Sequence, residues 1–341
     1  MQDVTLVGID LGKHSFHLHG QDRHGKAVFR KKVSRKQLIE FFATFHACTV
    51  VMEACAGAHH MARKLASFGH QVKLISPQFV RPFVKSNKND FVDAEAICEA
   101  ASRPAMRFVT PKTESQQTLS ALHRVRDSLV RDRVKAVNQI HGFLLEFGIS
   151  LPVGNAIITR LPAVLAEHSL PPSLVAILER LHVHFKYLSE QIGEIDKELA
   201  RQLADNEFGQ RLLTIPGVGP ITASVLAAEM GDGKQFGCSR DFAASIGLVP
   251  RQYSTGGKAN LLGISKRGDK KIRRLLVQCA RAYMQRLERQ SGPLSDWVRA
   301  MLARRHSNVV ACALANKLAR TAWALVTRNT TFNAGSAAMP A

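Results

Sequence analysis

The first 75 residues follow an order of strands and helices that few folds accommodate. Three strand-like segments come first, and a helix, a strand, a helix and a further strand follow, over residues 4–10, 16–20, 27–33, 34–46, 49–52, 61–68 and 72–75. The first segment, Val-Thr-Leu-Val-Gly-Ile-Asp, is almost wholly apolar, as a strand buried in the centre of a sheet must be. We therefore predict an α/β domain whose sheet begins as a meander and continues through helical connections.

Carboxylates lie at the ends of these elements. Asp10 closes the first strand, Glu53 follows the strand at 49–52, and Asp90 and Asp93 share one face of the next predicted helix. Hard oxygen ligands suit Mg²⁺, and two such ions clamp a phosphate in phosphoryl transfer. Taken singly, each acid has a structural explanation, since an Asp at a strand end usually forms a turn and Asp90 can cap a helix. Only the combination indicates a metal site, and it fits an RNase-H-like order.

Two long helices are predicted further along the chain. Residues 113–147 combine an apolar face with an opposite face rich in Arg and Lys. Between Leu174 and Leu199, apolar residues recur at alternating spacings of four and three, which forms a heptad seam of about four heptads. Such a seam is typical of a coiled-coil arm that joins protomers. The sequence therefore predicts an oligomerisation arm and a homodimer.

Positive charge dominates the composition. The 341 residues carry 47 Lys and Arg against 27 Asp and Glu, a formal net charge of +20, and the hydrophobic fraction of 45% is that of an ordinary globular chain. Such a surface attracts polyanions, so nucleic acid is the expected partner. Six scattered cysteines without a Cys-x-x-Cys pair argue against a disulfide framework and a zinc ribbon. No signal peptide or membrane span is evident, so we expect a protein of the bacterial cytosol, associated with the nucleoid and not with a membrane.

Several short motifs resemble those of a known family. Gly8-Ile9-Asp10, Met52-Glu53-Ala54 and Asn89-Asp90-Phe91-Val92-Asp93 resemble the RuvC-like DEDD domain of a class of insertion-sequence transposases related to Piv-type DNA invertases. In the C-terminal half, the segments 215–219, 242–251 and 263–269 resemble the second, transposase-specific domain of the same family. The resemblance extends from about residue 4 to residue 328.

This resemblance implies a metal-dependent DNA recombinase. In the family, four carboxylates hold Mg²⁺ beside a serine that attacks DNA and forms a covalent intermediate. Carried over, this makes Asp10, Glu53, Asp90 and Asp93 the expected metal ligands, for Mg²⁺ or alternatively Mn²⁺. The family also implies target and donor DNA as substrates, a structured guide RNA made by the element, active sites shared between protomers, and two dimers that join as a tetramer on the nucleic acids.

The nucleophile does not carry over unchanged. Alignment from Gly247 to Gly256 places the family's serine on Thr255, with Ser254 immediately before it. Thr255 keeps a hydroxyl but adds a methyl group at Cβ, which crowds the attack and stiffens the side chain. We favour Thr255 and keep Ser254 as the alternative. Spacing alone indicates only a flexible Ser-Thr-Gly-Gly loop.

Basic residues expected to bind nucleic acid gather in two places. The polar face of the helix at 113–147 is suited to the backbone of a guide duplex and carries Arg124, Arg126, Arg131, Arg133 and Lys135. The second group surrounds and follows the candidate nucleophile, where acids are nearly absent, and comprises Lys258, Lys266, Arg267, Lys270, Lys271, Arg273 and Arg274. Only three Tyr and two Trp are present, so base stacking is not the main expected mode.

The predicted organisation has four parts. These are a RuvC-like, RNase-H-like domain with the long basic helix at 1–150, a coiled-coil arm at 160–205, a mostly α-helical transposase domain with a helix-hairpin-helix-like element at 206–328, and a flexible tail at 329–341. Two other functions stay open: a Holliday-junction-resolvase-like nuclease whose acids activate water, and a non-enzymatic nucleic-acid-binding protein. A covalent protein–DNA intermediate distinguishes the transposase from the nuclease, and the presence of all four acids disfavours the third function.

Overall fold

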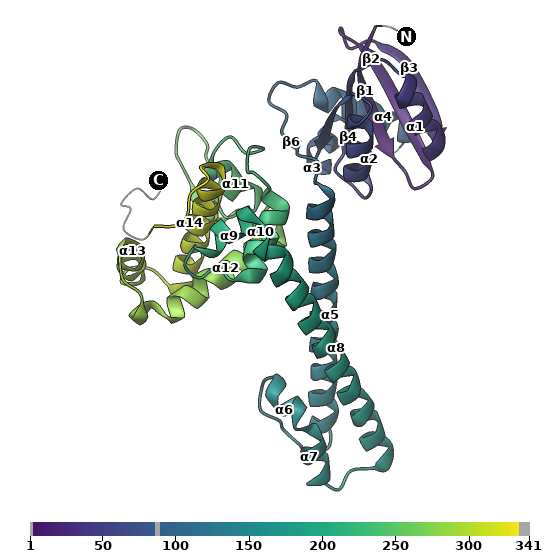
Figure 1. Cartoon of the computed structure of the whole chain (residues 1–341). Helices are drawn as coiled ribbons and strands as arrows, with labels where there is room; N and C mark the ends of the chain where they lie inside the picture. The colour runs from purple at the N-terminus through teal and green to yellow at the C-terminus, as the bar shows by residue number, and fades with distance from the viewer. Residues whose placement is uncertain (1–2, 86–88, 334–341) are drawn as a thin grey trace. The chain divides into compact units, whose positions relative to one another are not determined.

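A computed structural model describes residues 3–85 and 89–333. By packing, the chain divides into two compact units, Met1–Glu114 and Ser115–Ala341, which are described separately here (Figure 1). The first unit is built around a mixed sheet, and the second is almost entirely helical. The predicted succession of an α/β N-terminal region and a mostly helical C-terminal region is confirmed.

Six strands form one sheet in the first unit, in the order β3-β2-β1-β4-β5-β6. The strands β1 (Val4–Leu11), β2 (Ser15–Asp22) and β3 (Ala27–Ser34) pair antiparallel as a meander. On the other side of β1, β4 (Thr49–Glu53) runs parallel to it, and β5 (Gln71–Ile75) runs parallel to β4. A short edge strand that the sequence did not indicate, β6 (Phe108–Val109), pairs antiparallel with β5.

Helices cover both faces of this sheet (Figure 1). On one face, α1 (Arg35–Thr44) and α2 (Ala58–Ala66) pack against side chains of β1, β2 and β4 that include Ile9, Leu18 and Met52. On the other face lie α4 (Asp90–Ala101) and the short helices α3 (Pro77–Val80) and η1 (Arg81–Phe83). The sheet is therefore the middle of three layers, and its central strands are buried on both sides.

Gly8, in the middle of β1, sets how closely α4 approaches the sheet. A Cβ atom on Gly8 would overlap the carbonyl oxygen of Ala94 and would lie 2.7 Å from Sγ of Cys98. The missing side chain therefore lets the backbone of α4 pack directly on β1. Because side chains alternate along a strand, Gly8 and Asp10 share the face that α4 covers.

A long helical hairpin forms part of the second unit. Its two arms are α5 (Glu114–Leu145) and α8 (Pro172–Ala204), which lie side by side and are joined through α6 (Asn155–Thr159) and α7 (Leu161–Ala166) (Figure 1). Packing thus places almost all of α5 in the second unit, whereas the sequence analysis grouped it with residues 1–150.

The heptad seam of α8 is buried inside this hairpin. Leu178 and Phe185 pack with Ile140 and Leu144 of α5 and with residues of α6 and α7. Nearer the other end, Leu199 packs against Leu119 of α5. The same chain therefore covers the seam, which removes the reason for assigning it to contacts between protomers.

The other helices of the second unit enclose its largest core. They are α9 (Glu207–Leu213), α10 (Pro220–Met230), α11 (Ser239–Ser245), α12 (Lys270–Gln285), η2 (Leu287–Arg289), α13 (Pro293–Leu302) and α14 (Ser307–Thr327). Gly217, with φ of +82°, turns the chain between α9 and α10. A Cβ atom on it would lie 2.8 Å from the carbonyl oxygen of Cys279, so close packing on α12 requires glycine here.

Helix α14 is the most apolar long helix among the described residues. It is long and apolar enough to cross a membrane by length and composition, which no other helix among the described residues is. In the structure, 61% of its apolar window is buried inside the protein. Its residues Val310, Leu314 and Leu318 belong to the core of the second unit. Its apolar character is therefore explained by packing.

Residues 250–264 form a β-hairpin rather than a plain loop. The strand β7 (Pro250–Gln252) pairs antiparallel with β8 (Leu261–Ile264), and the N–H of Tyr253 donates to the carbonyl oxygen of Asn260 at 2.9 Å. Gly256 and Gly257, with φ of +56° and +76°, lie between the strands, in a conformation that favours glycine.

A buried polar contact joins α5 to α10. The side chain of His123, 3% exposed, forms a hydrogen bond of 3.0 Å with Oγ of Ser224. Burial, aided by the nearby charge of Lys271, lowers the pKa of His123 to about 4. The imidazole is therefore neutral in the folded protein near neutral pH.

We expect Gly8→Ala to destabilise the protein by about 1–3 kcal/mol, the usual cost of overpacking a core, because α4 must move away from β1. Thermal or urea unfolding measures the change. Gly142→Ala in α5 is the matched control, since a Cβ atom there meets nothing within 4 Å. That control should be neutral or slightly stabilising. Equal stability of Gly8→Ala and the wild type would contradict the close approach described above.

The low pKa of His123 predicts a pH-dependent loss of stability. The unfolded chain takes up a proton near pH 6.5, whereas the folded protein does so only near pH 4. Stability should therefore fall as the pH drops through this window, by about 3 kcal/mol in total. Unfolding measured at several pH values should show that His123→Gln, which cannot titrate, lacks this component. Parallel pH profiles for the variant and the wild type would contradict the prediction.

Candidate active site and nucleic-acid interface

The carboxyl ends of β1 and β4 bring Asp10 and Glu53 to the same edge of the sheet. The two strands are parallel, and Ile9 pairs with Met52, so the next residue of each strand lies beside the other. Both acids share the face of the sheet that α4 covers. Burial, together with the charges of Asp10 and Asp93, raises the pKa of Glu53. The acids are thus close enough to repel one another.

The first turn of α4 adds two more carboxylates to this edge. Asn89 is the N-cap, and its side chain accepts a hydrogen bond of 2.9 Å from the N–H of Phe91. Asp90 is therefore the first helical residue and not the cap, which excludes the simplest structural role for it. Asp90 and Asp93 both lie in the first turn of the helix.

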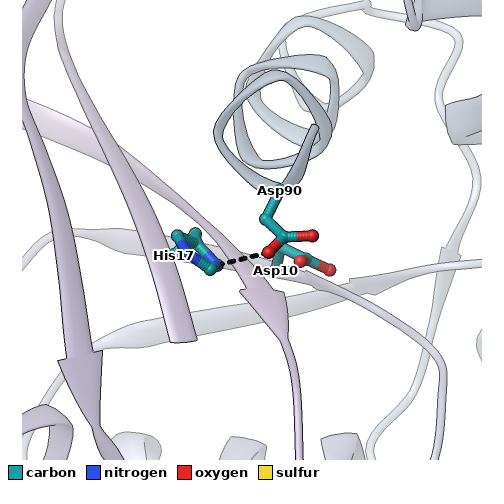
Figure 2. Close-up of side chains that lie close together, drawn as sticks. All are labelled: Asp10, His17 and Asp90. Atoms are coloured by element: carbon teal, nitrogen blue, oxygen red, sulfur yellow. Dashed lines mark ion pairs between the residues drawn. The ribbon is translucent and has the colours of Figure 1, made fainter. Parts of the chain in front are cut away.

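His17 completes a cluster that the sequence analysis did not include. It pairs with Asp10 across β1 and β2, and it is 5% exposed. Its Nδ1 atom lies 3.5 Å from Oδ2 of Asp90 (Figure 2). Phe91 packs edge-on against the imidazole, with ring centroids 4.8 Å apart. The alternation Phe-His-Leu-His in the second strand was the available signal, but only the strand register places His17 on the face of Asp10.

This cluster has donors that suit a divalent cation. One ligand atom each from Asp10, His17 and Asp90 lies within 4.8 Å of the other two. Carboxylate oxygens fit Mg²⁺ and Mn²⁺, and an imidazole nitrogen favours a transition metal such as Mn²⁺ over Mg²⁺. The residues present therefore fit the metal that the four acids predict, and they add a nitrogen to the donor set.

The two candidate nucleophiles follow β7 in the hairpin. Oγ of Ser254 accepts hydrogen bonds from Nε2 of Gln252 at 3.0 Å and from the N–H of Asn260 at 3.2 Å. Thr255 forms a bridge with Lys258 through the backbone, and no hydrogen bond of its hydroxyl is found in the described part of the chain. The lone pairs of Ser254 are thus occupied within the hairpin, whereas the Thr255 hydroxyl is available.

Close backbone contacts anchor the base of the hairpin. Gly247 and Gly268 have φ of +72° and +74°. A Cβ atom on Gly247 would overlap the carbonyl oxygen of Arg267, and one on Gly268 would overlap that of Ser245. Nη1 of Arg273 donates to the carbonyl oxygens of Ile246 at 2.8 Å and of Arg267 at 3.0 Å. Arg273, which the sequence analysis assigned to nucleic acid, is thus engaged in holding the hairpin.

The other predicted basic residues differ in their surroundings. Exposed residues on the hairpin and at its base are Lys258, Lys266, Arg267 and Lys270. On α5, Arg133 is half-buried, and Lys135 pairs with Asp132 at 3.1 Å. The remaining five line a single pocket in the second unit: Arg124, Arg126 and Arg131 of α5, with Lys271 and Arg274 of α12. The structure thus brings together two basic groups that are far apart in the sequence.

Comparison with known proteins identifies relatives over the whole chain. The model of the family described as "Transposase IS116/IS110/IS902 family" matches residues 209–293, and a DEDD transposase model of the IS110 type matches residues 7–149. The transposase for insertion sequence element IS1328 of Yersinia enterocolitica is 68% identical over 98% of this chain and 100% of its own length. The chain belongs to this family of insertion-sequence transposases.

More distant relatives agree with this membership. The transposase for insertion sequence element IS1111A of Coxiella burnetii is 43% identical over 98% of this chain and 93% of its own length. The pilin gene-inverting protein of Moraxella bovis is 22% identical over 64% of this chain and 62% of its own length. The protein is thus an enzyme of DNA cleavage and rejoining. The DEDD match includes all four acids and extends past the first compact unit, through the whole of α5.

We expect His17→Asn to weaken binding of Mn²⁺ to the transposase about 10- to 100-fold, the usual cost of losing a metal ligand's partner. The reason is that the imidazole both faces Asp90 and completes the donor set. Titration of the full-length protein with Mn²⁺, followed by electron paramagnetic resonance, measures the affinity. The matched control is His24→Asn, because His24 is exposed in the turn that follows β2. Unchanged affinity in His17→Asn would exclude a role for His17 in the site.

Proposed function

We propose that this transposase cleaves and rejoins DNA through a covalent intermediate on Thr255, at a site where Asp10, Glu53, Asp90 and Asp93 hold Mg²⁺ or Mn²⁺. The observation that carries the proposal is the cluster of Asp10, His17 and Asp90 at the carboxyl edge of the sheet, with ligand atoms within 4.8 Å of one another. Glu53 and Asp93 lie close enough to interact with it electrostatically. The strand order β3-β2-β1-β4-β5, with only β2 antiparallel to both neighbours, supports an RNase-H-like domain.

The residues of the proposed site have different roles. A bound divalent cation stabilises charge on the reacting phosphate. Asp10, Glu53, Asp90 and Asp93 hold the cation. His17 both contacts Asp90, at 3.5 Å, and offers a nitrogen donor to the cation. Thr255 supplies the nucleophile, because its hydroxyl lacks the two hydrogen bonds that engage Ser254.

The covalent step conserves the number of phosphate ester bonds. Oγ of Thr255 attacks phosphorus, the bond from phosphorus to one sugar oxygen breaks, Thr255 loses its hydroxyl proton, and the departing sugar oxygen gains a proton. Attack of a different sugar hydroxyl on the threonine phosphoester then rejoins DNA and restores Thr255. Since one ester replaces another at each step, the exchange needs no energy-rich cofactor.

We also propose that a structured guide RNA and two DNA duplexes, target and donor, occupy the protein together. The support is electrostatic. A net charge of +20 and basic residues on both α5 and α12 can neutralise many phosphate groups. The active protein would be a homodimer that forms a tetramer on nucleic acid, with active sites shared between protomers. It would act in the bacterial cytosol, at the nucleoid. Because the chain itself buries the seam of α8, these contacts would use other surfaces.

The proposal predicts a covalent adduct that depends on Thr255. The protein is purified with its bound RNA, the RNA is sequenced, and the complex is incubated with matching DNA and Mg²⁺. A band resistant to denaturation should form with the wild type, with Thr255→Ser and with Ser254→Ala, and should be lost with Thr255→Ala. Asp10→Asn should abolish the adduct without loss of RNA binding, because its acid holds the metal.

Other outcomes would redirect the assignment. Loss of the adduct in Ser254→Ala with retention in Thr255→Ala would move the nucleophile to Ser254. Cleavage without any adduct, in all variants that retain the acids, would favour the resolvase-like nuclease, in which water attacks phosphorus. Recovery of no RNA with the active protein would remove the guide from the proposal.

A further inference from the structure

A basic pocket in the second unit is lined by no residue of the hairpin at 250–264 that carries Thr255. It has a volume of about 590 Å³ and is formed by α5, the start of α10 and α12. Five cationic side chains line it together with one carboxylate, that of Asp127: Arg124, Arg126, Arg131, Lys271 and Arg274. Such a concentration of positive charge is unfavourable for the isolated protein, so it indicates an anionic ligand.

Ion pairs within the protein compensate only part of this charge. Asp127 lies 2.9 Å from Nζ of Lys271 and 3.8 Å from Nη2 of Arg274. Asp196 of α8 accepts from Arg126, with one contact at 3.2 Å. Arg124 and Arg131 are exposed, and neither has an ion pair in the described part of the chain. Two arginines are thus available, and two further cations share a single half-buried carboxylate.

The spacing of the available arginines suits a strand of nucleic acid. Arg124 and Arg131 are two helical turns apart on one face of α5, a separation of about 10 Å along the helix axis. Phosphates on one strand of a duplex follow each other at about 3.4 Å along the duplex axis, so the two arginines are far enough apart to reach different phosphates. No Phe, Tyr or Trp lines the pocket, so it has no platform for stacking bases. Five cations also exceed what a single phosphate group needs.

We propose that this pocket binds the phosphodiester backbone of one nucleic-acid strand, and that Asp127 is an internal counter-ion that holds Lys271 and Arg274 until phosphates replace it. The inference rests on the proposed function in that the ligand is a nucleic acid. A phosphodiester offers two charged oxygens to each guanidinium, so it competes well with a carboxylate at 3.8 Å. Binding here is independent of base sequence, because only the backbone is contacted.

His123 helps to fix the helix that carries the arginines of the pocket. It precedes Arg124 on α5 and is fixed by its hydrogen bond to Ser224 of α10. Burial and the charge of Lys271 lower the pKa of His123, so the imidazole stays neutral and adds no further positive charge next to the cations. The contact thereby fixes α5 against α10 at the level of the pocket.

The first test removes the two available arginines. Binding of the full-length protein to labelled single-stranded and duplex oligonucleotides, of DNA and of RNA, is measured over a range of KCl concentrations. For Arg124→Ala/Arg131→Ala, the slope of log K against log salt should decrease in magnitude by about 1.4–1.8, which corresponds to two lost phosphate contacts. The control Arg160→Ala/Arg180→Ala removes two exposed arginines elsewhere in the second unit and should leave the slope unchanged. The oligonucleotide type whose slope changes identifies the strand bound, DNA or RNA.

The second test removes the counter-ion. Asp127→Asn should tighten binding several-fold at low salt, because a competing carboxylate is lost while the amide keeps its shape. Asp132→Asn is the control, since Asp132 pairs with Lys135 on the same helix but does not line the pocket. Weaker or unchanged binding in a folded Asp127→Asn protein would overturn the role of Asp127. The exposed arginine pair keeps the proposal testable if Asp127→Asn fails to fold.

The results separate this inference from the proposed function. If the wild type binds nucleic acid and forms the Thr255 adduct, but the arginine pair behaves like its control, only the pocket is excluded. If the wild type binds no nucleic acid at all, the proposed function fails as well.

Discussion

The close contact between α4 and β1 over Gly8 is the constraint on which the acidic cluster at the edge of the sheet depends. Asp10 and Glu53 are positioned by the sheet alone, since they end parallel neighbouring strands. Asp90 and Asp93 come from a helix more than thirty residues further along the chain. Only because the backbone of α4 lies directly on β1 does Asp90 come within 3.5 Å of His17. A single missing Cβ atom therefore controls whether the acids form one site.

Electrostatic repulsion opposes this arrangement, and packing offsets it. Burial and the neighbouring acids raise the pKa of Glu53. The fold therefore holds the carboxylates close together although their negative charges repel one another. The cores on both faces of the sheet supply the compensating free energy. A cation bound at the proposed site would relieve this repulsion. The basic pocket presents the opposite case, where Asp127 and Asp196 relieve part of the repulsion among cations.

Several features could be predicted from residues alone because they depend on local rules. The order of strands and helices in the first unit follows from apolar runs and turns, and it matches the structure from β1 to β5. The four acids were recognisable by their positions at strand ends and in one helical turn. His17 could not be recognised in this way, because only the pairing register of β2 with β1 places it beside Asp10. The hairpin at 250–264 was also missed, since its two strands are short and mostly exposed.

The sequence by itself determined which faces are apolar, where the acids and cations lie along the chain, and that both kinds of charge are too concentrated to be accidental. The tertiary structure alone decided what each face meets. Periodicity shows that the seam of α8 must be covered, but a partner chain and the chain's own α5 satisfy that requirement equally. Likewise, Arg124 and Lys271 share a pocket only because α5 packs against α10 and α12. Local propensity acts over a few residues, whereas these contacts join segments that lie from tens to more than a hundred residues apart, and only the packed chain specifies them.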